Sequence, residues 1–161
     1  MWLVSRRWRA RPAAVEGRHR GYPHPPEGIK GAQARALAIF LARSGVPALA
    51  ITETIVSRFG YDFGRTVDDI RANNPHSDAC QETVPEAMTC ALTADSFEDA
   101  MRNAVSIGGD SDTIAAIAGS LAEPLFGLLD EIKNESVARL PEDIVRIIQQ
   151  YYADSRVLGS Y

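Results

Sequence analysis

The sequence predicts an all-α fold, in which several helices pack as an orthogonal or bundle-like array. Apolar residues recur at intervals of three and four along most of the chain, as they do on one face of a helix. Glycine, proline and capping residues divide these periodic segments into helix-sized pieces. No stretch alternates apolar and polar residues in the manner of a half-buried strand, and no internal repeat is found.

The composition is that of a single globular domain. The 161 residues are 45% apolar and 24% charged, and such a length is sufficient to bury a core. No apolar run approaches the roughly 20 residues that a membrane helix needs, and residues 1–14 lack the apolar centre of a secretory signal. Without an export signal or zinc-like spacing, Cys80 and Cys90 are expected to be free, reduced thiols. The predicted location is the cytoplasm, with no membrane partner.

Residues 1–25 are predicted to form an unstructured basic arm. Six arginines and one glutamate give residues 1–20 a net charge of +5, so the remainder of this chain of net charge −4 carries −9. A basic arm on an acidic body can contact nucleic acid. However, short terminal arms without periodicity are usually unordered, which disfavours a nucleic-acid partner here.

The first predicted helix begins at Glu27 and ends at Gly45. Its apolar stripe consists of Ile29, Ala32, Ala36, Leu37, Phe40 and Leu41. Pro47 suits the first turn of a second helix, which Gly60 ends. The apolar residues of that helix are Leu49, Ile51, Ile55, Val56 and Phe59.

The middle of the chain contains two further predicted helix starts. Thr66 and Asp69 open a short third helix, and the polar segment 71–82 is predicted to be a loop. Thr83 and Glu86 have the spacing of a capping box, so the fourth helix is expected to begin there. Its apolar residues are Val84, Ala87, Met88, Ala91 and Leu92.

Four helices are predicted in the last third of the chain. The first of them begins at Ser96–Asp99 and ends at Gly108–Gly109. Its inward-facing residues are predicted to be Phe97, Ala100, Met101, Ala104 and Val105. The helix Asp110–Phe126 follows, and residues 129–140 and the segment after Pro141 supply the last two. The last helix carries Ile144, Val145, Ile147, Ile148 and Tyr151. The helix from Asp110 has an apolar face of Ile114, Ile117, Ala118 and Leu121, with small residues at Ala115, Ala116 and Gly119 that allow close packing.

The clearest chemistry lies in the turn Asp110–Thr113, which follows two glycines. Asp110 suits the N-cap and Asp112 the first turn, because free N–H groups and the helix dipole favour negative charge there. The same turn offers two carboxylates and a hydroxyl, which are the oxygen ligands that Mg²⁺, Mn²⁺ or Ca²⁺ prefer. A cation would relieve the repulsion between the carboxylates. Capping and metal binding are compatible, and both interpretations stay open.

Three segments, in order along the chain, resemble the ADP-ribosylglycohydrolase family, the group of the dinitrogenase-reductase-activating glycohydrolase. GGDSDTIAAIAG resembles the C-terminal metal motif of that family. The other two segments are PEGIKGAQARALAIFLA at Pro26–Ala42 and TVPEAM at Thr83–Met88. The resemblance predicts that residues 26–155 form the C-terminal part of such a helical domain. Residues 1–25 resemble nothing in the family, so the chain is expected to be truncated at its N-terminal side.

The resemblance implies a hydrolase that cleaves the bond between ADP-ribose and an acceptor, which is a protein side chain or a small molecule. It implies two divalent cations, usually Mg²⁺, with Mn²⁺ as the alternative, held between an early Thr-Asp-Asp motif and a late Asp-x-Asp-Thr/Ser motif. The late motif matches Asp110, Asp112 and Thr113. The implied substrate-binding positions are Gly108, Gly109, Ser111 and His24. The alternative for His24 is an exposed loop histidine, because it is out of register with the family's histidine loop.

No Thr-Asp-Asp run precedes Pro26, which leaves three hypotheses for function. The chain is a hydrolase half-domain that works with a complementing chain, or an inactive remnant that at most binds metal or ADP-ribose. The third hypothesis is a non-catalytic helical interaction module, in which the acidic turn only caps a helix. No catalytic residue is assigned. Apolar surface that the missing part would cover also predicts self-association.

Overall fold

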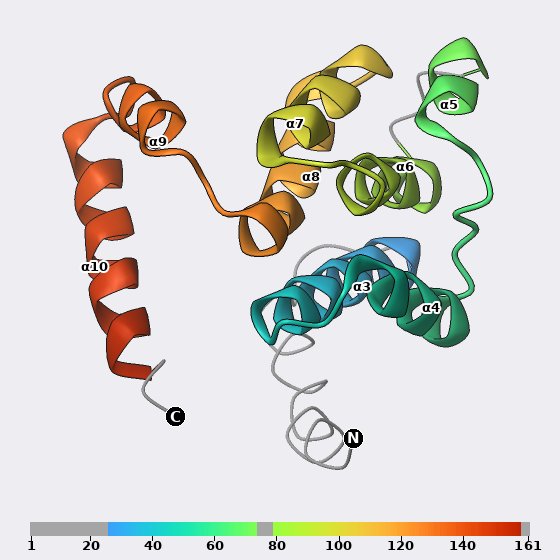
Figure 1. Ribbon diagram of the computed structural model, residues 1–161, viewed down its shortest axis with the longest axis horizontal. Helices are drawn as coiled ribbons and strands as arrows, with labels where there is room; N and C mark the ends of the chain where they lie inside the picture. Colours follow the sequence, from blue (N-terminus) through green and yellow to red (C-terminus); the bar gives the residue numbers. More distant parts are fainter. Residues whose placement is uncertain (1–25, 74–78, 159–161) are drawn as a thin grey trace.

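The structure is a computed structural model that describes residues 26–73 and 79–158, and this part of the chain contains eight helices and no strand (Figure 1). The helices are α3 (Pro26–Arg43), α4 (Ala48–Phe59), α5 (Val67–Asn73), α6 (Cys80–Leu92), α7 (Phe97–Ser106), α8 (Ser111–Phe126), α9 (Asp130–Val137) and α10 (Glu142–Leu158). The all-α prediction is confirmed. None of the described helices is both long and apolar enough to span a bilayer. The predicted basic arm lies outside the described residues.

The core of the molecule is built around α6. Every residue from Thr83 to Ala91 is buried. The helices α3, α7 and α8 pack against α6, and α3 and α7 also pack against α8 (Figure 1). The largest fully buried side chains are Ile51, Ile55, Ile70, Met88, Ile107, Leu121 and Cys90. Both cysteines are free, as predicted: Cys90 is buried and Cys80 is exposed.

Several predicted helix ends are confirmed by their hydrogen bonds. Thr66 and Asp69 bond reciprocally before α5, with the Asp69 backbone N–H donating to Thr66 Oγ1 at 3.1 Å and the Thr66 hydroxyl donating to Asp69 Oδ2 at 2.6 Å. Ser96 caps α7, because its Oγ accepts from the backbone N–H of Asp99 at 3.1 Å. Gly60 ends α4 in the left-handed region, with φ 66°.

The helix α8 has the predicted apolar face, and all four predicted residues, Ile114, Ile117, Ala118 and Leu121, are buried. Gly119 lies against α7 so closely that a Cβ atom there would be 3.1 Å from Met101 Sδ. Ala116, in contrast, is exposed. The predicted close packing therefore occurs on the Gly119 side of α8.

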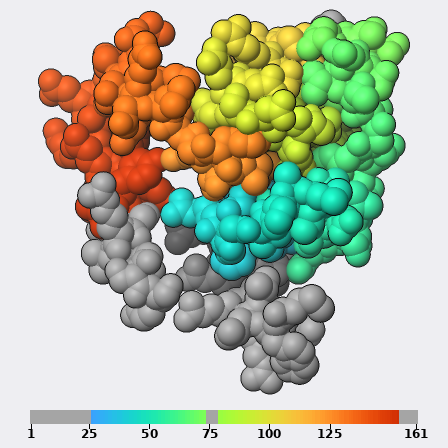
Figure 2. Space-filling model, in the orientation of Figure 1, coloured from blue at the N-terminus to red at the C-terminus, as the bar shows by residue number. Residues whose placement is uncertain are grey.

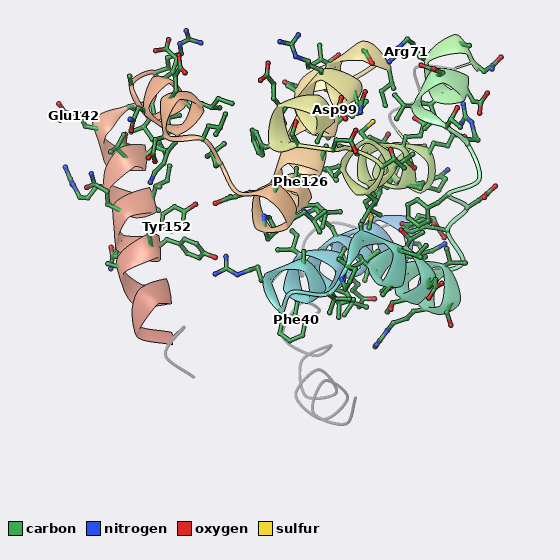
Figure 3. All side chains as sticks on the ribbon, in the orientation of Figure 1. Phe40, Arg71, Asp99, Phe126, Glu142 and Tyr152 are labelled. Carbon is green, nitrogen blue, oxygen red and sulfur yellow. The ribbon has the colours of Figure 1, made fainter. Side chains whose placement is uncertain are left out.

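The predicted stripe of α3 is only partly correct. Leu37 and Leu41 are buried, but Ala32 and Ala36 are exposed and the Phe40 side chain is 41% exposed (Figure 3). The buried face is Gly31, Ala34, Leu37, Ala38, Leu41 and Ala42. Because α3 is apolar on more than one side, its periodicity alone does not select the face that packs on α4, α6 and α8.

The predicted start of α6 is wrong. The helix begins at Cys80, so residues 80–82 are helical and not part of a loop. Thr83 is buried within the helix, three residues after its first residue, and Glu86 accepts a hydrogen bond from Arg65 Nη1 at 2.9 Å. Burial of nearly the whole helix outweighs the local capping pattern and the presence of Pro85 within it.

The helices α9 and α10 lie beside the rest of the molecule, at the left of the view (Figure 2). The Tyr152 hydroxyl of α10 donates to Glu123 Oε1 of α8 at 2.7 Å, which ties the two parts together. On α10, Ile147 is 62% exposed and Tyr151 57% exposed. Val105 of α7 was predicted to face inward but is 58% exposed, because α7 buries only a narrow face of small residues against its neighbours.

Candidate functional site

The acidic turn, defined as residues Gly108–Thr113, connects α7 to α8. Ile107 anchors its first end, because this side chain is only 1% exposed. Gly108 and Gly109 then have φ values of 77° and 72°, in the left-handed region that glycine adopts without a Cβ clash. The two glycines reverse the chain and leave the following acidic residues at the surface.

Asp110 holds the N-cap position of α8 but does not cap it with its side chain. Its backbone has φ −74° and ψ 72°, and its carboxylate makes no capping hydrogen bond. The backbone carbonyl of Asp110 accepts from the Ile114 N–H at 2.9 Å, which starts the helix. The side-chain capping expected of Asp110 is thus not observed.

Asp112 lies one residue into α8, and its carboxylate is held in place. The backbone N–H of Thr113 donates to Asp112 Oδ1 at 2.8 Å. A hydrogen bond with the Asp110 side chain is the largest cause, and the bond from Thr113 the second, of a pKa of Asp112 below its ordinary value. Asp110 and Asp112 are therefore neighbours in the turn, and both residues are exposed to solvent.

The structure brings most of the predicted site residues into this one turn. The predicted metal ligands are Asp110, Asp112 and Thr113, and the predicted substrate-binding residues of the turn are Gly108, Gly109 and Ser111. His24 lies outside the described residues. Within residues 26–73 and 79–158, no group of three or more histidine, cysteine, aspartate and glutamate side chains is placed to hold a metal ion. The donor set of two adjacent carboxylates and a hydroxyl fits one side of a magnesium site.

Sequence analysis missed Arg71, which supports the turn from α5. Arg71 donates to Ser106 Oγ from Nη2 at 2.7 Å and from Nε at 3.1 Å, and the Ser106 hydroxyl donates to the Asn103 carbonyl at 2.8 Å. Arg71 also pairs with Asp68. Figure 3 shows the labelled Arg71 side chain beside α5 at the edge of the molecule. Because Ser106 ends α7, this contact fixes the chain just before Gly108. No sequence pattern indicates it, since 35 residues separate the partners.

Three surface cavities lie on other elements. A cavity of about 620 Å³ lies between α8 and α10 and is lined in part by Tyr152. A cavity of about 420 Å³ adjoins α5 and α7 and is lined in part by Asp99. A cavity of about 270 Å³ adjoins α3 and α6. The acidic turn, by contrast, is an open surface feature, with Gly109, Asp110 and Asp112 all exposed.

Comparison with known protein families decides the assignment of the chain. The family model described as ADP-ribosylglycohydrolase matches residues 19–159, which is most of the sequence. The chain belongs to the ADP-ribosylglycohydrolase family. Searches of curated proteins and of solved structures found no match. The family match confirms the resemblance predicted from the sequence, and it includes the whole acidic turn and all eight described helices of this ADP-ribosylglycohydrolase-like protein.

Proposed function

We propose that this protein takes part in hydrolysis of the bond between ADP-ribose and an acceptor, with Asp110, Asp112 and Thr113 as ligands of a divalent cation. The observation that carries the proposal is the start of α8, where two exposed carboxylates, Asp110 and Asp112, and the Thr113 hydroxyl lie within four consecutive residues. Membership of the ADP-ribosylglycohydrolase family supplies the reaction class. A bound Mg²⁺ pair would supply Lewis-acid stabilisation of charge and a positioned water.

The residues of the turn have separate roles in this proposal. The Asp110 carboxylate, which makes no capping bond, and the Asp112 carboxylate hold the cation together with the Thr113 hydroxyl. The Thr113 N–H orients Asp112 through its hydrogen bond. Gly108 and Gly109, which carry no side chain, let a ribose approach the backbone closely.

The remaining ligands come, in this proposal, from outside these residues. The family resemblance implies a Thr-Asp-Asp motif opposite the acidic turn, and no Thr-Asp-Asp run occurs in the 161 residues. We therefore expect the isolated chain to bind metal and ADP-ribose weakly and to hydrolyse little. A complementing chain that carries the second motif would restore turnover.

The test is calorimetric titration of ADP-ribose into the 161-residue chain, with Mg²⁺ and with a chelator. The proposal expects Mg²⁺-dependent binding that the double variant Asp110→Asn/Asp112→Asn abolishes. The control is Asp130→Asn/Glu131→Gln, which removes the same charge from the first turn of α9 and leaves binding unchanged. Absence of binding to a folded chain would contradict the proposal.

A role as a helical interaction module is the second candidate. It is favoured by large apolar side chains that the described helices leave exposed, such as Leu49 at 72% and Leu129 at 64%. Binding of a protein partner by a chain that binds neither Mg²⁺ nor ADP-ribose would support this role over hydrolysis.

A further inference from the structure

We draw no further inference here: the strongest candidate, the cavity of about 620 Å³ between α3, α8, α9 and α10, is lined by two basic and two acidic side chains that together favour no ligand charge, and nothing in the described part of the chain shows what covers the exposed apolar face of α10 beside it.

Discussion

At the residue scale, the two N-caps that precede α7 and α8 behave differently. Ser96 has extended backbone angles, φ −156° and ψ 168°, and its side chain caps α7. Asp110 has φ −74° and ψ 72°, and its side chain caps nothing. The Asp110 carboxylate interacts with the Asp112 side chain and does not cap the helix. This difference supports a ligand role for Asp110 over the purely structural one.

Arg71 is predicted to position the acidic turn without touching a ligand. In Arg71→Leu, loss of both hydrogen bonds to Ser106 should let the end of α7 move. The Mg²⁺-dependent affinity for ADP-ribose should fall roughly three- to tenfold. Amide hydrogen exchange at Gly108 and Ser111 should also become faster, and this readout needs no ligand.

The matched control for Arg71 is Arg102→Leu on α7. Arg102 is 75% exposed and pairs with Glu98, one turn away on the same helix. This substitution should change neither hydrogen exchange in the turn nor affinity. Equal effects of both variants would contradict a positioning role for Arg71.

The Arg65–Glu86 pair predicts a pH-dependent stability. Burial is the main cause that raises the pKa of Glu86, and Arg65 opposes it. Because the folded-state pKa is above the ordinary value, ionisation of Glu86 costs stability as the pH rises through this range. In Arg65→Ala, the stability lost on ionisation of Glu86 should rise to roughly 1–2 kcal/mol at about pH 7. This loss is smaller than the loss for a fully buried ion pair, because Arg65 is 43% exposed.

The cost of Arg65→Ala should shrink as the pH falls to about 4, where Glu86 becomes protonated. Denaturant unfolding at both pH values measures this difference. Arg139→Ala, which breaks an exposed pair with Glu135 on α9, should have a small effect at either pH. A destabilisation by Arg65→Ala that does not depend on pH would show that the guanidinium acts through packing alone.

At the element scale, Gly119 sets the distance between α7 and α8. A Cβ atom at this position would already lie 3.1 Å from Met101 Sδ. Gly119→Val should therefore force the helices apart and lower the free energy of unfolding by about 1–3 kcal/mol, as overpacking does. Chemical denaturation followed by circular dichroism measures the change.

The control for Gly119 is Ala116→Val, on the exposed side of the same helix. It should cost only about 0.5 kcal/mol, because valine has a lower helix propensity than alanine and meets no neighbour there. Similar costs for the two variants would contradict close packing at Gly119.

At the scale of the whole molecule, exposed apolar side chains predict self-association. Leu49 is 72% exposed, Leu129 64% and Ile147 62%, and α3 carries a second apolar side that includes Phe40. Such surfaces are usually covered by a partner or by another copy. Sedimentation velocity should show species larger than a monomer, in proportions that rise with concentration.

Leu49→Gln and Ile147→Gln, combined in one variant, should shift this equilibrium toward the monomer. Both side chains are exposed, so the substitutions should leave the melting temperature nearly unchanged. A parent chain that sediments as a monodisperse monomer at all concentrations would contradict the prediction.

The sequence by itself determined the helical class, the approximate positions of the helices and the acidic turn. These features depend on residues close together in the chain: apolar periodicity in α8, the Ser96 cap of α7 and the Gly108–Gly109 pair. They are local, so a linear pattern records them. For the same reason the family resemblance, which rests on short motifs, was visible before the structure.

Only the tertiary structure decided which faces are buried and which distant residues meet. The sequence did not indicate the exposed sides of α3, the exposure of Val105 or the early start of α6. It also did not indicate the Arg71–Ser106 contact or the buried Tyr61 hydroxyl, which has no hydrogen-bond partner among the described residues. Each depends on neighbours from other helices, whose packing outweighs local propensity and periodicity. The sequence determines such contacts only through the complete fold, so the positions of all the helices are needed to identify them.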